Sequence, residues 1–169
     1  MFWSRPLLPE EVAFVQRFFG TSLNALLPRL RIYLRRIGDT RRALSMNGGR
    51  LYLPAGFFED RNPRKRLHLA HPAVAGIFAH ELLHQWQRLQ GRKVTREALR
   101  LQLHAICLNS DPYAYSGGSD EQAMLEVFLQ ASVEQQGQIW QDHVSAVIAG
   151  RPLACMQAVQ RHVCAEAVS

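Results

Sequence analysis

The residues His80-Glu81-Leu82-Leu83-His84 lie in the segment whose pattern is most clearly helical, and the interpretation of the whole chain starts from them. Pro72 suits a first helical position, apolar residues recur at helical spacing from Val74 onward, and Gly91 follows the end, so we predict a helix over 72–89. Residues four apart share one helix face, with about 5–6 Å between their Cβ atoms. The two imidazoles can therefore bind the same cation.

The chemistry of this motif indicates zinc. Neutral imidazole binds Zn²⁺ at about 2.0–2.1 Å, and catalytic zinc sites keep three protein ligands and a water. Glu81 adjoins the first histidine, where a carboxylate can take a proton from that water and pass it to a leaving amine. Two neighbouring surface histidines are the alternative, because a motif with three fixed positions also arises by chance. The flanking Ile77, Phe78 and Trp86 favour the metal site.

A third ligand must come from another segment, because Arg88 stands one turn beyond His84. Gln87 and Gln90 occupy the places where the metzincin extension needs glycine and histidine, which excludes that variant. A carboxylate from a later helix is the alternative. The candidates are Glu121, Glu126, Glu134 and Asp142. We favour Glu134, because the residues between it and His84 suffice for a helix, a loop and a return.

A hydrolase also needs a donor that stabilises the developing negative charge. Tyr113, Tyr115 and His143 are candidates, the tyrosines because they lie in the loop between the two ligand helices. A packed aromatic or a surface histidine is the alternative for each. Zinc-binding histidines usually donate their other ring N–H to a second polar group. For that role the candidates are Asp142, Gln135 and Asp120. The other histidines are interpreted as ordinary residues.

The first half of the chain predicts an α+β fold. A helix is expected over 9–19, and the alternation of apolar and polar residues from Leu30 predicts a strand over 30–35. Two short apolar runs, 43–46 and 51–53, flank Asn47-Gly48-Gly49, which is typical of a hairpin turn. Residues 57–70 are expected to form a loop. These elements predict a small antiparallel sheet in a mainly helical domain.

The second half is expected to be helical. One helix is predicted from Thr95 to Ile106, followed by a loop over 109–118. Ser119-Asp120 and Ser132 are both capping signals, which leaves open whether one long helix or two follow. Gly150-Arg151-Pro152 interrupts the pattern, so we predict one domain over 1–150 and a short helix or loose tail over 151–169.

Composition narrows the class of protein. At 169 residues and 47% hydrophobic, the chain can form one compact core. Three cysteines without paired spacing indicate free thiols from a reducing compartment. No apolar run is long enough to span a membrane, and the start does not resemble an export signal. The net charge of +6 is concentrated over 29–66, and we interpret this segment as a solvated face, because no nucleic-acid-binding module accompanies it.

Three segments resemble a known family. They are 5–11 with Phe19-Gly20, the helix segment 80–87, and 133–136 with Ile139 and Asp142. Together they resemble bacterial Vgr-related HExxH proteins, which are similar to peptidase domains linked to contractile injection systems. They are more distantly similar to the metallopeptidase toxin domain at the C-terminus of some VgrG spike proteins. The resemblance covers roughly residues 5–145.

This resemblance implies a minimal gluzincin-like metallopeptidase fold, with zinc held by His80, His84 and Glu134 and with Glu81 as the base. It also implies an antibacterial effector of a type VI secretion system. Such a protein is cytoplasmic in the producing bacterium and is delivered without a signal peptide into the envelope of a target cell. Expected partners are a peptide or protein substrate, secretion-spike proteins and a cognate immunity protein.

Two other functions remain as alternatives to a peptidase. Zinc can hold helices together without catalysing a reaction, which would make the chain a zinc-stabilised adaptor or spike-associated module. The arginine-rich segment 29–66 would be the binding surface of a nucleic-acid-binding protein.

Overall fold

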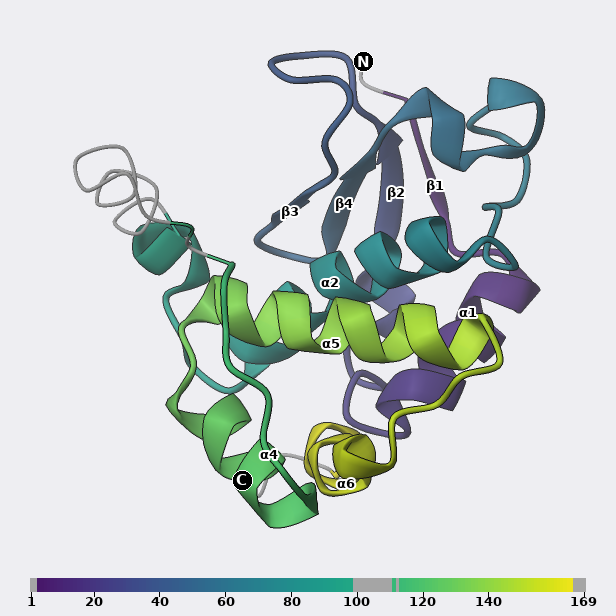
Figure 1. The fold of residues 1–169 in the computed structure, drawn as a ribbon. Coiled ribbons are helices and arrows are strands. Elements are labelled where there is room, and N and C mark those ends of the chain that lie inside the picture. The colour runs from purple at the N-terminus through teal and green to yellow at the C-terminus, as the bar shows by residue number, and fades with distance from the viewer. Residues whose placement is uncertain (1–2, 99–110, 112, 166–169) are drawn as a thin grey trace.

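The computed structural model describes residues 3–98, 111 and 113–165, and it has a small sheet above a layer of helices (Figure 1). The strands are β1 (Ser4–Pro6), β2 (Arg31–Leu34), β3 (Leu44–Met46) and β4 (Arg50–Leu53). The α-helices are α1 (Pro9–Phe19), α2 (Pro72–Leu89), α4 (Glu121–Gln130), α5 (Val133–Ile148) and α6 (Gln157–Cys164). The prediction of an α+β domain rich in helix is confirmed.

The sheet is mixed, and the prediction of an antiparallel sheet was wrong. Its strand order is β1-β2-β4-β3, with β2 and β4 parallel and both outer pairs antiparallel. The predicted hairpin is present, but its second strand, not its first, pairs with β2. Alternation of apolar and polar residues sets which face of a strand is buried and carries no information on strand order. β1, which the sequence did not predict, is only three residues long and contains Pro6.

The inner face of the sheet is apolar in its centre and polar at both edges. The pairing aligns Arg5, Ile32, Leu51 and Ser45 across the four strands, and all four side chains are buried. Ser45 accepts hydrogen bonds from Gln85 Nε2 at 2.6 Å and from an Arg88 guanidinium nitrogen at 2.8 Å. The edge strand β3 is therefore fastened directly to α2.

Most of the predicted helices are present. Helices α1 and α2 have the predicted bounds. Two helices, not one, follow the loop, because Ala131 and Ser132 interrupt the helical pattern between α4 and α5. Residues 94–98 are helical, and the rest of the helix predicted up to Ile106 lies outside the described residues.

The segment after residue 150 forms the short helix α6, not a loose tail. Met156, Val159 and Val163 are buried in the same apolar cluster as residues of α1, α2 and α4. Cys155 and Cys164 are free thiols, and Cys107 lies outside the described residues. No helix in the described ranges is both long and apolar enough to cross a membrane.

A buried ion pair fixes the far edge of the sheet. Two guanidinium nitrogens of Arg5 donate to the carboxylate of Glu11 at 2.6 and 2.7 Å. The same guanidinium donates to the carbonyls of Pro63 and Lys65 at 2.9 Å each. Glu11 also accepts from the backbone N–H groups of Leu8 and Leu67. This pair thus connects β1, the start of α1 and the loop over 59–67.

We expect Glu11→Ala to lower the free energy of unfolding by about 3–5 kcal/mol, because it leaves the buried Arg5 charge and two N–H groups without a partner. Urea unfolding followed by circular dichroism measures this change. Glu10→Ala is the matched control, because Glu10 is exposed on the same helical turn and should shift stability by no more than about 0.5 kcal/mol. Equal effects of the two substitutions would contradict this role for the ion pair.

Candidate metal centre

Three side chains from two helices converge on one point. His80 and His84 project from α2, and Glu134 projects from the first turn of α5. The Nε2 atoms of the two histidines are 3.1 Å apart. The Glu134 oxygens lie 3.5 Å from His80 Nε2 and 3.7 Å from His84 Nε2. All three residues are buried, so these polar groups are held together away from bulk water.

These distances suit a tetrahedral zinc ion. Ligand atoms at about 2.0–2.1 Å from a tetrahedral metal lie about 3.3 Å from one another. The three observed separations, 3.1, 3.5 and 3.7 Å, lie close to that value. Two neutral imidazoles and one carboxylate are also a donor set that zinc accepts in catalytic sites. Zinc as the metal remains a prediction, and the three residues fit it.

Two glycines let the ligand helices approach this closely. A Cβ atom added to Gly137 of α5 would lie 2.6 Å from Cε1 and Nε2 of His80. A Cβ atom added to Gly76 of α2 would lie 2.8 Å from the carbonyl oxygen of Gln141 on α5. Both distances are too short for real contacts, so any side chain would push the helices apart. Neither glycine was predicted as part of the site, although a glycine inside a helix is unfavourable enough to signal a packing requirement.

A capping box places Glu134 at the start of α5. Ser132 Oγ accepts a hydrogen bond from the backbone N–H of Gln135, and Gln135 Oε1 accepts one from the N–H of Ser132. The sequence Ser132-Val133-Glu134-Gln135 predicted this cap, and it is confirmed. Because a helix N-terminus carries partial positive charge, it favours the charged form of a carboxylate in the first turn.

Gln87 holds the ring of His84. Its Oε1 lies 2.8 Å from His84 Nδ1, so Nε2 of this histidine points toward the metal centre. The amide nitrogen of Gln87 donates to the carbonyl of Val133 at 3.0 Å and to Gln136 Oε1 at 2.9 Å. Gln136 in turn donates to the carbonyl of Phe128. This chain of amides fixes both the ring and the distance between α2 and α5.

None of the three residues predicted to orient the histidines takes part in this chain of amides. Asp120 caps α4, Gln135 belongs to the cap of α5, and Asp142 accepts from Tyr115 and Gln138. The signal that could have identified Gln87 was its place one turn after a ligand, on the buried face of the helix.

Burial and neighbouring charges set the protonation of the ligands. Burial and the charge of His80 lower the pKa of His84 to about 4, so its imidazole is neutral at neutral pH. Burial lowers the pKa of His80, but the hydrogen bond to Glu134 and the charges of Glu81 and Glu134 outweigh it, and the net shift is upward. Burial raises the pKa of Glu134, but its bond to His80 and the charges of both histidines lower it overall. The carboxylate is therefore charged and ready to bind a cation.

Glu81 lies beside the ligands and has a different environment. Burial, together with the charge of Glu134, raises its pKa to about 7, against the opposing charges of His80, Arg88 and Arg35. A group with a pKa near the working pH can both accept and release a proton. Glu81 thus has the properties that general acid–base catalysis requires.

The centre opens into a cleft of about 620 Å³. His80, Glu81, His84 and Glu134 line it, and β3 and residues 94–98 contribute to its walls. Tyr113 lines the same cleft, with its ring centroid 6.4 Å from that of His80, and its hydroxyl accepts from an Arg42 guanidinium nitrogen at 2.9 Å. Burial and the charge of Glu134 raise the pKa of Tyr113, so its hydroxyl keeps its proton at neutral pH.

The other two candidate donors have different surroundings. The hydroxyl of Tyr115 donates to Asp142 at 2.8 Å, and Tyr115 does not line the cleft. His143 is buried on α5, where its Nε2 pairs with Oε1 of Gln160 from α6 at 3.0 Å. Of the three, only Tyr113 lines the cleft together with Glu81 and the His80, His84 and Glu134 group. Among the third-ligand candidates, the structure places Glu134 there.

The fold and the site define an α+β domain with a His-His-Glu group in a cleft. No model of a known protein family matches this chain, and no curated protein matches it. A solved structure with the same fold is the effector domain of Pseudomonas aeruginosa VgrG2b. The similarity covers 90% of this chain and 79% of that chain, with a TM-score of 0.67 and 18% identity. At this identity the comparison establishes the fold, and the gluzincin-like character stays a prediction.

We expect Gly137→Ala to weaken zinc binding at least about tenfold, because either the His80 ring or the whole of α5 must move to admit the methyl group. Competition with a fluorescent zinc chelator measures the affinity. Gly56→Ala is the matched control, because nothing lies within 4 Å of an added Cβ there. Unchanged zinc affinity in Gly137→Ala would contradict the close fit of α5 against His80.

Proposed function

We propose that this chain is a zinc-dependent peptidase. The observation that carries the proposal is the convergence of His80, His84 and Glu134 at tetrahedral spacing in the same cleft as Glu81. Three protein ligands are the number that catalytic zinc sites use, whereas structural zinc sites usually have four. Within the described ranges, the group contains three residues.

In this proposal, the residues divide the work of hydrolysing a peptide bond. His80, His84 and Glu134 would hold the zinc ion, which when bound supplies Lewis-acid activation of water. Glu81 would accept the proton of the attacking water and later give it to the leaving amine, a role that its raised pKa suits. Tyr113 would donate a hydrogen bond to the developing negative charge.

We further propose that the chain acts as an antibacterial effector delivered by a type VI secretion system. Two observations support this. The fold is similar to a structure described as an effector domain, and the segments quoted above resemble Vgr-related HExxH proteins. A fold alone does not determine a substrate or a target. Two partners are therefore proposed separately: a spike protein that carries the chain and an immunity protein that neutralises it. Copurification with the chain would test each of them.

We expect Glu81→Gln to keep about one zinc per chain and to lose at least about a hundredfold in peptidase activity, because the amide cannot accept the proton. Zinc is measured by mass spectrometry of the metal, and cleavage by mass spectrometry of a pool of synthetic peptides. His80→Ala should lose both zinc and activity. His68→Ala is the control, because His68 is exposed and should lose neither. Full activity of Glu81→Gln would exclude this residue as the base and favour a zinc-stabilised module.

We expect the chain to inhibit growth of a bacterial host when a signal sequence directs it to the periplasm, and to be harmless when it is retained in the cytoplasm. The Glu81→Gln chain with the same signal sequence is the control, because it should fold and bind zinc without turnover. Colony counts after induction measure the difference. Equal growth of hosts that carry the wild-type and Glu81→Gln chains in the periplasm would remove the effector proposal but not the peptidase proposal.

A further inference from the structure

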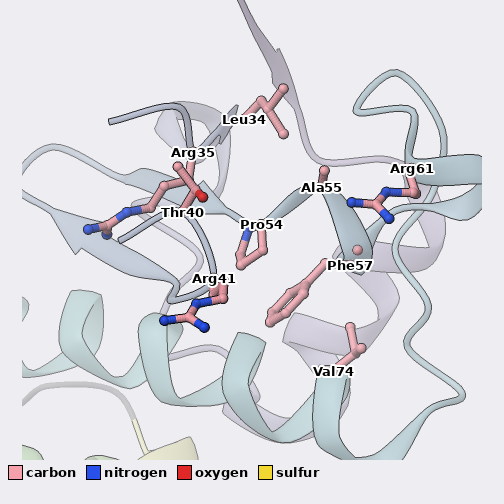
Figure 2. Close-up of a pocket in the computed structure, with 10 residues that line it drawn as sticks. Leu34, Arg35, Thr40, Arg41, Pro54, Ala55, Phe57, Arg61 and Val74 are labelled. Atoms are coloured by element: carbon pink, nitrogen blue, oxygen red, sulfur yellow. The ribbon is translucent and has the colours of Figure 1, made fainter. Parts of the chain in front are cut away.

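A second hollow of about 580 Å³ adjoins the metal cleft (Figure 2). Its apolar part is formed by Pro54 and Phe57, which follow β4, and by Val74 on α2. Ile77, one turn further along α2, lines the metal cleft, and His80 and Glu81 follow on the next turn. The two hollows therefore lie in sequence along the same helix.

Arginine side chains stand at both ends of this second hollow. Arg35 and Arg41 line both hollows, so they mark the junction between them. In Figure 2 their guanidinium groups point away from Phe57 and Val74. Arg61 lies at the opposite end, and its guanidinium points toward Ala55. A chain lying along the two hollows would pass all three guanidinium groups.

The charges along these hollows do not balance. Apart from Glu81 and Glu134 at the metal centre, the acidic residue among the described lining residues is Asp39, and it pairs with Arg41 at 3.5 Å. Two further arginines of the cleft are engaged, since Arg42 donates to Tyr113 and Arg88 to Ser45. Arg35 is half-buried, and its Nε has no hydrogen-bond partner among the described residues.

Arg61 lies in an unfavourable backbone conformation, which its surroundings hold in place. Asp60 and Arg61 both have positive φ, 52° and 55°, a conformation that residues other than glycine seldom adopt. The buried pair of Arg5 and Glu11 holds the loop that follows, through the carbonyls of Pro63 and Lys65 and the N–H of Leu67. Strained backbone persists where the surroundings enforce it and is common at ligand sites.

We propose that this second hollow is a substrate subsite for an acidic peptide, with Arg35 and Arg61 binding carboxylate side chains. The inference rests on the proposed peptidase function. Guanidinium groups bind carboxylates through paired, charge-assisted hydrogen bonds, and the apolar floor between them suits the aliphatic part of a peptide. A nucleic-acid strand would instead need stacking aromatics along an exposed basic track. In the second hollow the lining residue with an aromatic ring is Phe57, which is 9% exposed.

The test compares two fluorescein-labelled, alanine-rich peptides, one with glutamates and one with glutamines at the same places. Binding is measured by fluorescence polarisation in the zinc-loaded Glu81→Gln background, which prevents turnover of the probe. We expect the glutamate peptide to bind about tenfold more tightly than the glutamine peptide. Arg35→Gln/Arg61→Gln should abolish this preference, and Arg35→Lys/Arg61→Lys should keep part of it. The matched control is Arg36→Gln/Arg64→Gln, which removes the same charge from exposed neighbours that do not line the hollows.

Equal binding of the two peptides, or a preference that survives Arg35→Gln/Arg61→Gln as well as it survives the control, would overturn the subsite. Single-stranded DNA that displaces the glutamate peptide at a lower concentration than the peptide itself would also overturn it, in favour of a nucleic-acid groove. Because the assay measures binding without turnover, failure of the peptidase proposal can be distinguished from failure of the subsite proposal. A wild-type chain that cleaves nothing while its Glu81→Gln form prefers the glutamate peptide would support the subsite alone.

Discussion

The close approach of α2 and α5 is the constraint on which the rest of the structure depends. The histidines lie on one helix and the glutamate on the other, so the group of His80, His84 and Glu134 forms only at one separation of the two helices. Gly76 and Gly137 set that separation, because an added methyl group at either would meet the facing helix or the His80 ring. Each glycine costs a helix interior about 1 kcal/mol relative to alanine. This loss of helix stability accompanies a close spacing that larger residues would prevent. The hydrogen bond between the amides of Gln87 and Gln136 then stabilises this spacing.

Electrostatics around the centre depend on the same packing. Burial by the two helices is the largest influence on the pKa of the two histidines, Glu134 and Glu81, and the charges of these four groups add to it. The pKa values of the two carboxylates shift in opposite directions. Glu134 receives a proton donor from His80 and the positive end of α5, which favour its charged form. In the part of the chain that the structure describes, Glu81 has no such donor, and burial raises its pKa to about 7. One carboxylate is thus suited to holding a cation and the other to moving a proton, a separation of roles that follows from placement alone.

The sequence predicted those parts of the fold that depend on local pattern. Helix α2, the histidine pair and the cap of α5 could be identified because each is specified by residues within a few positions of one another. The strand order could not be predicted, because the pairing of β2 with β4 depends on which strand of a hairpin reaches it. Without the family resemblance, Glu134 could be favoured only by its distance along the chain, since several acidic residues follow the motif. Gln87, Gly76 and Gly137 each gave a local signal, but what they contact on the facing helix could not be read from it. Tyr113, Tyr115 and His143 were indistinguishable in the sequence, and their surroundings now separate them.

The sheet explains why the cleft and the second hollow have basic walls. Its inner face is apolar in the centre and polar at both edges. The polar residue at each edge forms hydrogen bonds that position a different wall. At one edge, Ser45 accepts hydrogen bonds from Arg88 and Gln85 of α2. These bonds hold β3 beside the cleft, which Arg41 and Arg42, just before β3, also line. At the other edge, Arg5 holds the loop that carries Arg61. The buried Arg5 needs Glu11 as its partner, so its charge is neutralised within the fold. Arg35 and Arg61 have no equivalent acidic partner among the described residues. Arg5 and Arg88 are thus bound within the fold, whereas Arg35 and Arg61, both in the basic segment 29–66, are the arginines that the proposed subsite uses.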